Sequence, residues 1–205
     1  IPVEDKTIVE LIIDKFTLRG CNDFFISTNY KKKILKSYFE EINHSYDLRF
    51  IDEDKPLGTA GSIKFAKKEL KKDFFVTNCD IIINSNLSSI ADFHKVEKND
   101  ITIVASVKKH VIPYGTCELN QDGSFSKLNE KPKFNFLINT GLYVLNKNVL
   151  SLIPKNKFFH MTDLIRKAKD KNNKVNVFPI NEEDWIDVGQ WGEYKNFINN
   201  ISGNF

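Results

Sequence analysis

Two aspartates stand beside short apolar runs, and they are the first candidates for chemistry. Asp80 lies within the run FFVTNCDIII, and Asp187 lies within DWIDVG. In open α/β sheets, ligands bind at the carboxyl ends of the strands, and a carboxylate there is costly to bury unless it is paired or bound to a cation. Mg²⁺ prefers oxygen ligands and is typically held by one or two carboxylates together with substrate phosphates. A shared Mg²⁺ site is one interpretation of this pattern, and the capping of two separate turns is the alternative; spacing alone does not decide between them.

The loop over 57–61, with the sequence LGTAG, is a second candidate because it opens a predicted helix. Glycines such as Gly58 let the backbone approach a ligand closely, and the N–H groups at a helix start suit polar or anionic atoms. The loop is not a Walker A motif, since the pattern G-x-x-x-x-G-K-[ST] is absent. A plain turn from loop to helix is the alternative.

Two further segments carry polar groups that suit a phosphorylated sugar. Glu130 and Lys131 close a predicted hairpin. A glutamate can accept hydrogen bonds from two sugar hydroxyls, and a lysine can hold a phosphate as a point charge. Asn139-Thr140-Gly141 interrupts an apolar strand, where a glycine often marks a bulge or the close approach of a ligand. An exposed charged turn and a simple bulge are the respective alternatives.

The order of predicted elements indicates how these residues are held. Helices alternate with strands up to Asp80, which predicts a parallel sheet with right-handed crossovers, and a β-rich part follows on its carboxyl edge. No linker divides the chain, so a single domain over 1–205 is expected. The predicted helices cover 8–19, 31–41, 62–70, 88–98, 161–171 and 190–198. The predicted strands cover 23–29, 48–51, the run that leads to Asp80, 101–107, 136–145, 175–180 and 185–187, with a hairpin of 114–120 and 125–129 around an Asp122-Gly123 turn.

The composition excludes several classes of protein. A net charge of +3 over 205 residues is too small to argue for a nucleic-acid partner. No apolar run approaches the roughly 20 residues that span a bilayer, so no membrane association is expected. Three cysteines, an odd number without a C-x-x-C motif, fit a reducing cytoplasm. The four histidines lack the spacing of a zinc site.

Taken together, the motifs resemble the sugar-1-phosphate nucleotidyltransferase family. The matching segments occur in the order PLGTAGSI, FFVTNCDIII, IPYGTCEL, NEKP, INTGLYVL and DWIDVGQW, and the similarity runs from Ile1 to about Tyr194. The resemblance implies a Rossmann-like three-layer α/β sandwich with a mixed, mostly parallel sheet and a β-rich sugar-binding insertion. It also implies the transfer of a nucleotidyl group from an NTP to a sugar 1-phosphate, which gives an NDP-sugar and pyrophosphate.

The resemblance also assigns roles to individual residues. Asp80 and Asp187 match the family's Mg²⁺ ligands, and Lys131 matches the lysine that holds the phosphate of the sugar. The implied substrate contacts are Gly58, Thr59 and Asn78 for the nucleotide, and Gly115, Glu130, Asn139 and Thr140 for the sugar. The family often has glycine at the position of Asn78, and a contact of Asn78 with ribose or with the sugar stays open.

Within the family, the DKTI start, the NCD tripeptide and the EDKPLGTAG loop are most similar to guanylyl-type enzymes that act on hexose or hexosamine 1-phosphates. Thymidylyl- and uridylyltransferases are alternatives. In the guanylyl subgroup, a pair of regulatory CBS domains can precede the catalytic domain, and a homo-oligomer is a further alternative to a monomer.

One departure concerns the start of the chain. The family's glycine-rich loop with its phosphate-binding arginine, and the lysine just before the position of Pro2, are absent here and are expected upstream of Ile1. Turnover by these 205 residues alone is therefore expected to be near zero. A catalytically inactive module that binds a nucleotide-sugar or sugar phosphate is the alternative from a different functional class.

Overall fold

The first helix begins where the sequence supplies a capping box. Thr7 and Glu10 exchange hydrogen bonds at the start of α1 (Ile8–Thr17), which satisfies N–H groups that the helix leaves without partners. The chain leaves the helix at Gly20, whose φ of +82° favours glycine. The computed structural model describes residues 2–3, 5–190, 192 and 194–195, and β1 (Pro2–Val3) pairs with β2 (Lys6–Thr7) just before α1.

The helix–strand alternation near the N-terminus gives a parallel strand pair, but the expected parallel sheet does not continue to the strand that leads to Asp80, which pairs with an antiparallel neighbour in another sheet. β3 (Asp23–Thr28) and β4 (Asp47–Asp52) pair in parallel, and α2 (Lys32–Glu41) connects them. Two parallel strands require such a crossover. Among the described residues, this pair forms a sheet of its own and is not hydrogen-bonded to the larger central sheet.

The central sheet is mixed, in the strand order β11-β7-β10-β5. β11 runs parallel to β7, whereas β10 is antiparallel to both β7 and β5. The direction of β10 follows from its connection, because β7 and β10 are joined through a hairpin and consecutive hairpin strands must be antiparallel. The strand bounds are β5 (Asp73–Thr77), β7 (Ile101–Val111), β10 (Lys133–Asn146) and β11 (Val175–Ile180).

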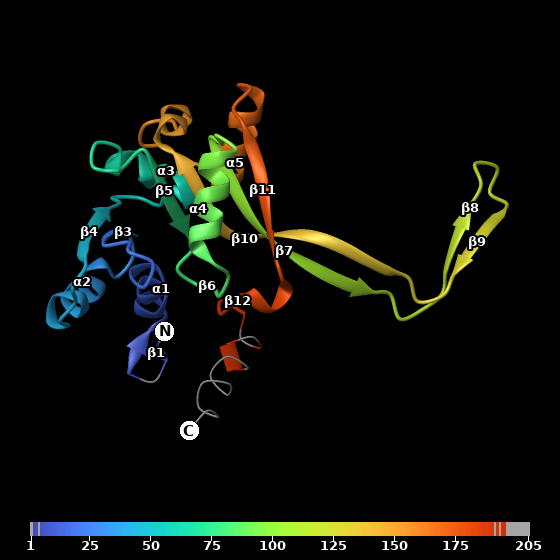
Figure 1. The fold of residues 1–205 in the computed structure, drawn as a ribbon, viewed down its shortest axis with the longest axis horizontal. Coiled ribbons are helices and arrows are strands. Elements are labelled where there is room, and N and C mark those ends of the chain that lie inside the picture. Colours follow the sequence, from blue (N-terminus) through green and yellow to red (C-terminus); the bar gives the residue numbers. More distant parts are fainter. Residues whose placement is uncertain (1, 4, 191, 193, 196–205) are drawn as a thin grey trace.

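Helices cover both faces of the central sheet. Because successive strand residues point to opposite faces, Leu142 and Val144 join one apolar cluster while Tyr143 and Leu145 join another. α1 and α4 cover the first cluster and α5 covers the second, so the body has three layers and the predicted α/β sandwich is confirmed (Figure 1). The remaining helical bounds are α4 (Leu87–Val96), α5 (Met161–Asp170), and the short 3₁₀ helices η2 (Lys147–Leu152) and η3 (Glu182–Asp184).

Two local expectations differ from the structure. The run through Asp80 is not one strand: β5 ends at Thr77, and β6 (Ile81–Ile83) pairs instead with β12 (Trp185–Asp187). The helix expected over 62–70 is replaced by the 3₁₀ helix η1 (Ser62–Ala66), which follows a single α-turn, α3 (Gly58–Gly61). The N–H groups of Ala60 and Gly61 in this turn donate to the carbonyl of Phe159, far away in the chain. The closing helix expected over 190–198 lies largely outside the described residues.

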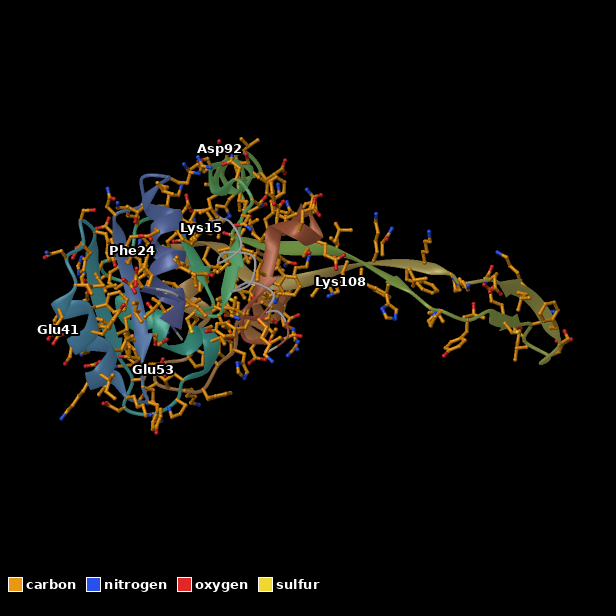
Figure 2. All side chains as sticks on the ribbon, turned by 90° about the horizontal axis from the view of Figure 1, so that it is seen from below. Lys15, Phe24, Glu41, Glu53, Asp92 and Lys108 are labelled. Atoms are coloured by element: carbon orange, nitrogen blue, oxygen red, sulfur yellow. The ribbon has the colours of Figure 1, made fainter. Side chains whose placement is uncertain are left out.

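A long two-stranded ribbon extends away from the body. β7 and β10 stay paired from Ala105↔Asn139 out to Val111↔Lys133, and the small hairpin of β8 (Thr116–Leu119) and β9 (Phe125–Asn129) lies at its far end. Figures 1 and 2 both show this arm projecting from the α/β body, and Figure 2 labels Lys108 at its base. The predicted hairpin around Gly123 is therefore confirmed. Among the described residues, no helix is long and apolar enough to cross a membrane.

A buried histidine on α4 joins the helix to the central sheet. His94 is 2% exposed, and its Nδ1 lies 2.8 Å from the hydroxyl of Thr102, which also accepts a hydrogen bond from Asn99. Burial lowers the pKa of His94, while the carboxylate of Asp73, 3.6 Å from Nε2, partly offsets this effect. The neutral imidazole is therefore the form that the fold accommodates.

This burial predicts a loss of stability in mild acid. The pKa of His94 lies below its ordinary value of about 6.5 in the native state, so the unfolded chain binds the proton more readily. The free energy of unfolding should fall as the pH is lowered from 7 through 6.5 and below, by up to about 1.4 kcal/mol per unit of pKa depression. Urea unfolding between pH 7 and pH 5 measures this slope. His94→Asn should flatten it, whereas His110→Asn, at an exposed position, should leave it unchanged. An unchanged slope in His94→Asn would contradict the assignment.

Candidate active site

The two predicted metal ligands converge at Gly189. A Cβ atom placed on Gly189 would lie 3.0 Å from Oδ2 of Asp80 and 3.1 Å from Oδ1 of Asp187. β6 and β12 bring the two together, since Asp187 pairs with Ile81, the residue after Asp80. The N–H of Val188 also donates to the backbone oxygen of Asp80 at 2.9 Å. Both carboxylates thus face one point.

Hydrogen bonds orient one of these carboxylates and leave the other open. Asp187 accepts from the N–H of Gly189 at 3.1 Å and from the side-chain amide of Gln190 at 2.8 Å. Within the described residues, the Asp80 side chain accepts no hydrogen bond, and neither aspartate forms an ion pair. No group of three or more metal-ligating side chains occurs in the same part of the chain. A pair of oxygen ligands fits Mg²⁺, which usually keeps waters and substrate phosphates in its other positions.

Gly141 brings β10 against the loop that carries Asp80. It has a φ of +87°, and the β7–β10 register shifts between Asn139 and Tyr143, so the predicted bulge is present. The backbone also makes a close approach, because a Cβ on Gly141 would lie 2.7 Å from the side-chain nitrogen of Asn78. The N–H of Asn78 donates to the carbonyl of Gly141 at 3.1 Å. The bulge therefore fixes the position of the loop 78–80.

Gly141→Ala should destabilise the protein more than an ordinary substitution at positive φ. The strained backbone costs about 1 kcal/mol or more, and the collision with Asn78 should raise the total to about 2–3 kcal/mol. Urea unfolding of Gly141→Ala measures the sum. Gly20→Ala is the matched control, because Gly20 has a φ of +82° with nothing within 4 Å of the added Cβ. Equal losses of stability in the two variants would show that the contact with Asn78 carries no cost.

The side chains of the two other residues of this bulge differ in their exposure to solvent. Asn139 is exposed, and its side chain donates to the hydroxyl of Tyr143 at 2.7 Å and accepts from the N–H of Gly141. Thr140 is 2% exposed, with its hydroxyl bonded to the carbonyl of Val104 and to the N–H of Leu142. The side chain of Asn139 is thus exposed to solvent, whereas the hydroxyl of Thr140 is hydrogen-bonded inside the fold.

The loop at Gly58 is held against the segment before α5. Gly58 has a φ of +74°, and a Cβ there would lie 2.7 Å from the carbonyl oxygen of Phe159, so only glycine fits. The hydroxyl of Thr59 accepts from the N–H of Met161 at 2.9 Å. In the described part of the chain, the N–H groups of Gly58 and Thr59 make no hydrogen bond. Two backbone donors therefore stay free to bind an acceptor such as a base carbonyl.

The predicted sugar contacts on the arm lie together but apart from the aspartates. A Cβ on Gly115 would lie 3.0 Å from Oε2 of Glu130, so these two residues are neighbours. Lys131 follows with a φ of 44°, in the turn that leads into β10. The ribbon runs from Asn139 out to Lys133 in continuous register, which at about 3.3 Å per residue is a reach of about 20 Å. The structure thus separates Gly115, Glu130 and Lys131 from Asp80 and Asp187.

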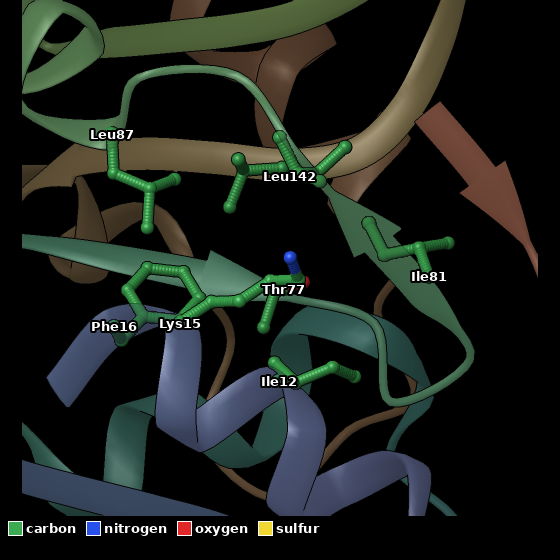
Figure 3. A pocket seen from close by; sticks show the side chains of 8 residues that line it. Ile12, Lys15, Phe16, Thr77, Ile81, Leu87 and Leu142 are labelled. Carbon is green, nitrogen blue, oxygen red and sulfur yellow. The ribbon is translucent and has the colours of Figure 1, made fainter. Parts of the chain in front are cut away.

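A small apolar pocket lies between α1 and β5, beside the end of the strand that leads to Asp80. Figure 3 shows Ile12, Phe16 and Leu142 in its wall, with Thr77 and Lys15 at its polar side. Lys15 donates to the side-chain oxygen of Asn84 at 2.7 Å, and burial lowers the pKa of its ammonium group. None of the predicted site residues lines this pocket, so we do not assign it to substrate.

Comparison with known proteins bears directly on this arrangement. The family model described as nucleotidyl transferase matches residues 1–203. The chain belongs to the nucleotidyl transferase family. A mannose-1-phosphate guanyltransferase 2 of Candida glabrata is 33% identical over 188 residues, and a mannose-1-phosphate guanyltransferase of Saccharomyces cerevisiae is 31% identical over 199. The match covers 87% of this chain and 51% of each relative, so the chain spans about half the length of these nucleotidyl transferases.

Solved structures support the same family fold. HddC from Yersinia pseudotuberculosis superposes with a TM-score of 0.75 at 22% identity, over 98% of this chain and 88% of that one. A nucleoside-diphosphate-sugar pyrophosphorylase from Vibrio cholerae superposes with a TM-score of 0.65 at 16% identity, over 97% and 90%. At such identities the likeness concerns the fold alone. The predicted nucleotidyl transferase fold is confirmed.

One residue of interest escaped the sequence analysis. Glu53 stands in the charged run DEDK, which is typical of an exposed loop, yet it is 9% exposed and hydrogen-bonded inside the fold. Its position five residues before Gly58, at the end of a predicted strand, is the only signal that sequence offered. Figure 2 places Glu53 in the α/β body, far from the arm.

Proposed function

We propose that this protein transfers a nucleotidyl group from an NTP, with GTP favoured, to a sugar 1-phosphate, and so releases an NDP-sugar and pyrophosphate. The observation that carries the proposal is the convergence of Asp80 and Asp187 at Gly189, in a chain of the nucleotidyl transferase family. The relatives named as mannose-1-phosphate guanyltransferases favour GTP and a hexose 1-phosphate. A crystal structure of HddC with GMP-PN supports the same preference.

The proposed reaction needs little covalent help from the protein. A phosphate oxygen of the sugar 1-phosphate attacks the α-phosphorus of the NTP in line with the leaving pyrophosphate. No general base is needed, because a phosphate monoester is already an anion near neutral pH. Mg²⁺ held by Asp80 and Asp187 would neutralise charge on the phosphate oxygens. Catalysis then rests on positioning and on charge neutralisation.

In this proposal Lys131 holds the phosphate of the sugar and aims it at the α-phosphorus. The arm must therefore approach the aspartates when substrate binds. Its surface is consistent with such a movement, because an exposed two-stranded ribbon is marginally stable in water and large exposed apolar patches usually mark an interaction site. The exposed apolar residues of the arm are Val111, Tyr114, Leu119, Phe125, Leu128, Phe134, Phe136 and Leu137.

A pyrophosphate assay tests the proposal. The full-length protein that contains this chain is incubated with Mg²⁺, each of four NTPs and several sugar 1-phosphates, and released pyrophosphate is measured after its hydrolysis to phosphate. We expect GTP with a hexose 1-phosphate to give the highest rate, and EDTA to abolish it. A faster rate with UTP or dTTP would reassign the base, and a protein that releases no pyrophosphate from any pair would instead support a binding module.

The cysteines at 21, 79 and 117 are free thiols, which suits the proposed cytoplasmic location.

A further inference from the structure

A buried carboxylate ties the ends of two strands to the loop before Gly58. Glu53 follows β4 and is 9% exposed. One of its carboxylate oxygens accepts from the hydroxyl of Ser27 on β3, and the other accepts from the N–H of Leu57 at 2.8 Å. Its backbone is held as well, because its N–H donates to the carbonyl of Thr28 and its carbonyl accepts from the side chain of Asn29.

The far side of the same loop is fixed independently. The carbonyl of Leu57 accepts from the N–H of Phe159 at 2.9 Å, and the carbonyl of Phe159 accepts from the N–H groups of Ala60 and Gly61. Leu57 itself is 1% exposed. The two peptide groups of Leu57 are therefore both held, the one with its N–H by Glu53 and the one with its carbonyl by Phe159. The second of these peptide groups also carries the N–H of Gly58.

The charge of Glu53 is stabilised by these donors. In the described part of the chain it forms no ion pair; the neighbouring Asp52 is the residue that pairs, with Lys36 at 2.8 Å. A buried carboxylate without a cation is costly, and it is kept only where its hydrogen bonds are well made. Charge-assisted bonds to a backbone N–H are about twice as strong as neutral ones. Glu53 is thus a strong restraint placed next to two unpaired backbone donors, those of Gly58 and Thr59.

We propose that Glu53 is a positioning residue for the nucleotide: it fixes the Leu57 peptide so that the N–H groups of Gly58 and Thr59 are aimed at the base before the base arrives. The inference rests on the proposed function, in which this loop contacts the nucleotide. According to this proposal, Glu53 affects the binding of the NTP. Other residues bind the sugar phosphate and act in the chemical step.

Three variants separate this role from general stability. Glu53→Ala removes both acceptors. Glu53→Gln keeps an oxygen for the N–H of Leu57 and turns an amide toward Ser27, whose hydroxyl can rotate to accept. Glu10→Ala is the matched control, because Glu10 also accepts from a backbone N–H, that of Thr7 at 2.7 Å, and from hydroxyl groups, but it lies on α1 and no predicted site residue contacts it.

The experiment measures steady-state kinetics, thermal unfolding and amide exchange in the full-length protein. Glu53→Ala should raise the KM for the NTP about 10-fold or more, the equivalent of one lost charge-assisted bond, while the KM for the sugar 1-phosphate stays within about twofold. Without any ligand, exchange of the Leu57 amide should accelerate about 10-fold or more. Glu53→Gln should recover most of both effects, and Glu10→Ala should lower the melting temperature and change neither.

Two results would overturn the proposal. One is a Leu57 amide that exchanges in Glu53→Ala at the rate of the parent protein. The other is a parallel rise of both KM values in Glu53→Ala, as a merely structural loss would produce. The proposed function fails separately, if the parent protein releases no pyrophosphate from any pair of substrates. In that case the amide exchange and NTP binding measured by calorimetry still decide whether Glu53 orders the loop for a nucleotide.

Discussion

Asp80→Asn and Asp187→Asn are each expected to lower kcat of the full-length protein by about 100-fold or more, because electrostatic stabilisation of a transferring phosphoryl group is worth several kcal/mol. The two carboxylates face the same point beside Gly189, so the loss of either one removes half of the proposed oxygen ligands of Mg²⁺. Asparagine keeps the size of the side chain and an oxygen acceptor. The Mg²⁺ concentration needed for half-maximal activity should rise in both variants.

Glu183→Gln is the control for this pair, since it removes one negative charge from the exposed turn that precedes β12 without touching Gly189. It should leave kcat and the Mg²⁺ requirement close to those of the parent protein. Thermal unfolding confirms that each variant is folded. An unchanged kcat in both aspartate variants would show that the two aspartates take no part in the mechanism. An equal loss of kcat in Glu183→Gln would show that the effect comes from the overall negative charge of this region.

The sequence predicted the site where local chemistry dictates local geometry. Gly141 was expected to mark a bulge or the close approach of a ligand, and the bulge is present; a φ of +87° and the proximity of Asn78 each exclude a side chain there. The convergence of Asp80 with Asp187 was expected because each follows or ends a strand at the same edge. The first prediction rests on a constraint that a few residues contain, whereas the second joins two segments far apart in the chain and rests on the order of the motifs along the whole sequence.

What the sequence could not provide depends on contacts between distant segments. A 3₁₀ turn stands in place of the helix expected after Gly61, and the residues before it are held by hydrogen bonds from Ala60 and Gly61 to Phe159, far away in the chain. No role was predicted for Glu53, since nothing local shows that Ser27 and the Leu57 amide enclose it. The direction of the arm could not be predicted either. The order of the motifs indicates which residues the arm carries, but not the direction in which a ribbon of this length extends.

The direction of the arm matters for function because the arm carries Lys131, and the variant Lys131→Met tests the role of this lysine. The substitution keeps most of the side-chain stem and removes the charge. Because a lysine that holds a phosphate contributes a charge-assisted contact of a few kcal/mol, kcat/KM for the sugar 1-phosphate should fall about 100-fold while the KM for the NTP changes little. Lys127→Met is the control, on β9 of the same arm and exposed. A loss in Lys127→Met as large as that in Lys131→Met would reduce the effect to the general charge of the arm.

Mixing two inactive variants then decides how Lys131 reaches the aspartates. If each arm bends back to the site of its own chain, a mixture of Asp80→Asn and Lys131→Met stays as inactive as either variant, because every chain lacks one essential group. This is the result we expect, since the glycine bulge at Gly141 lies at the base of the ribbon and next to the loop that carries Asp80, where a small rotation moves the distant tip through a large arc. Recovery of activity in the mixture would show instead that the arm of a second copy supplies Lys131, and that a single chain holds only part of the site.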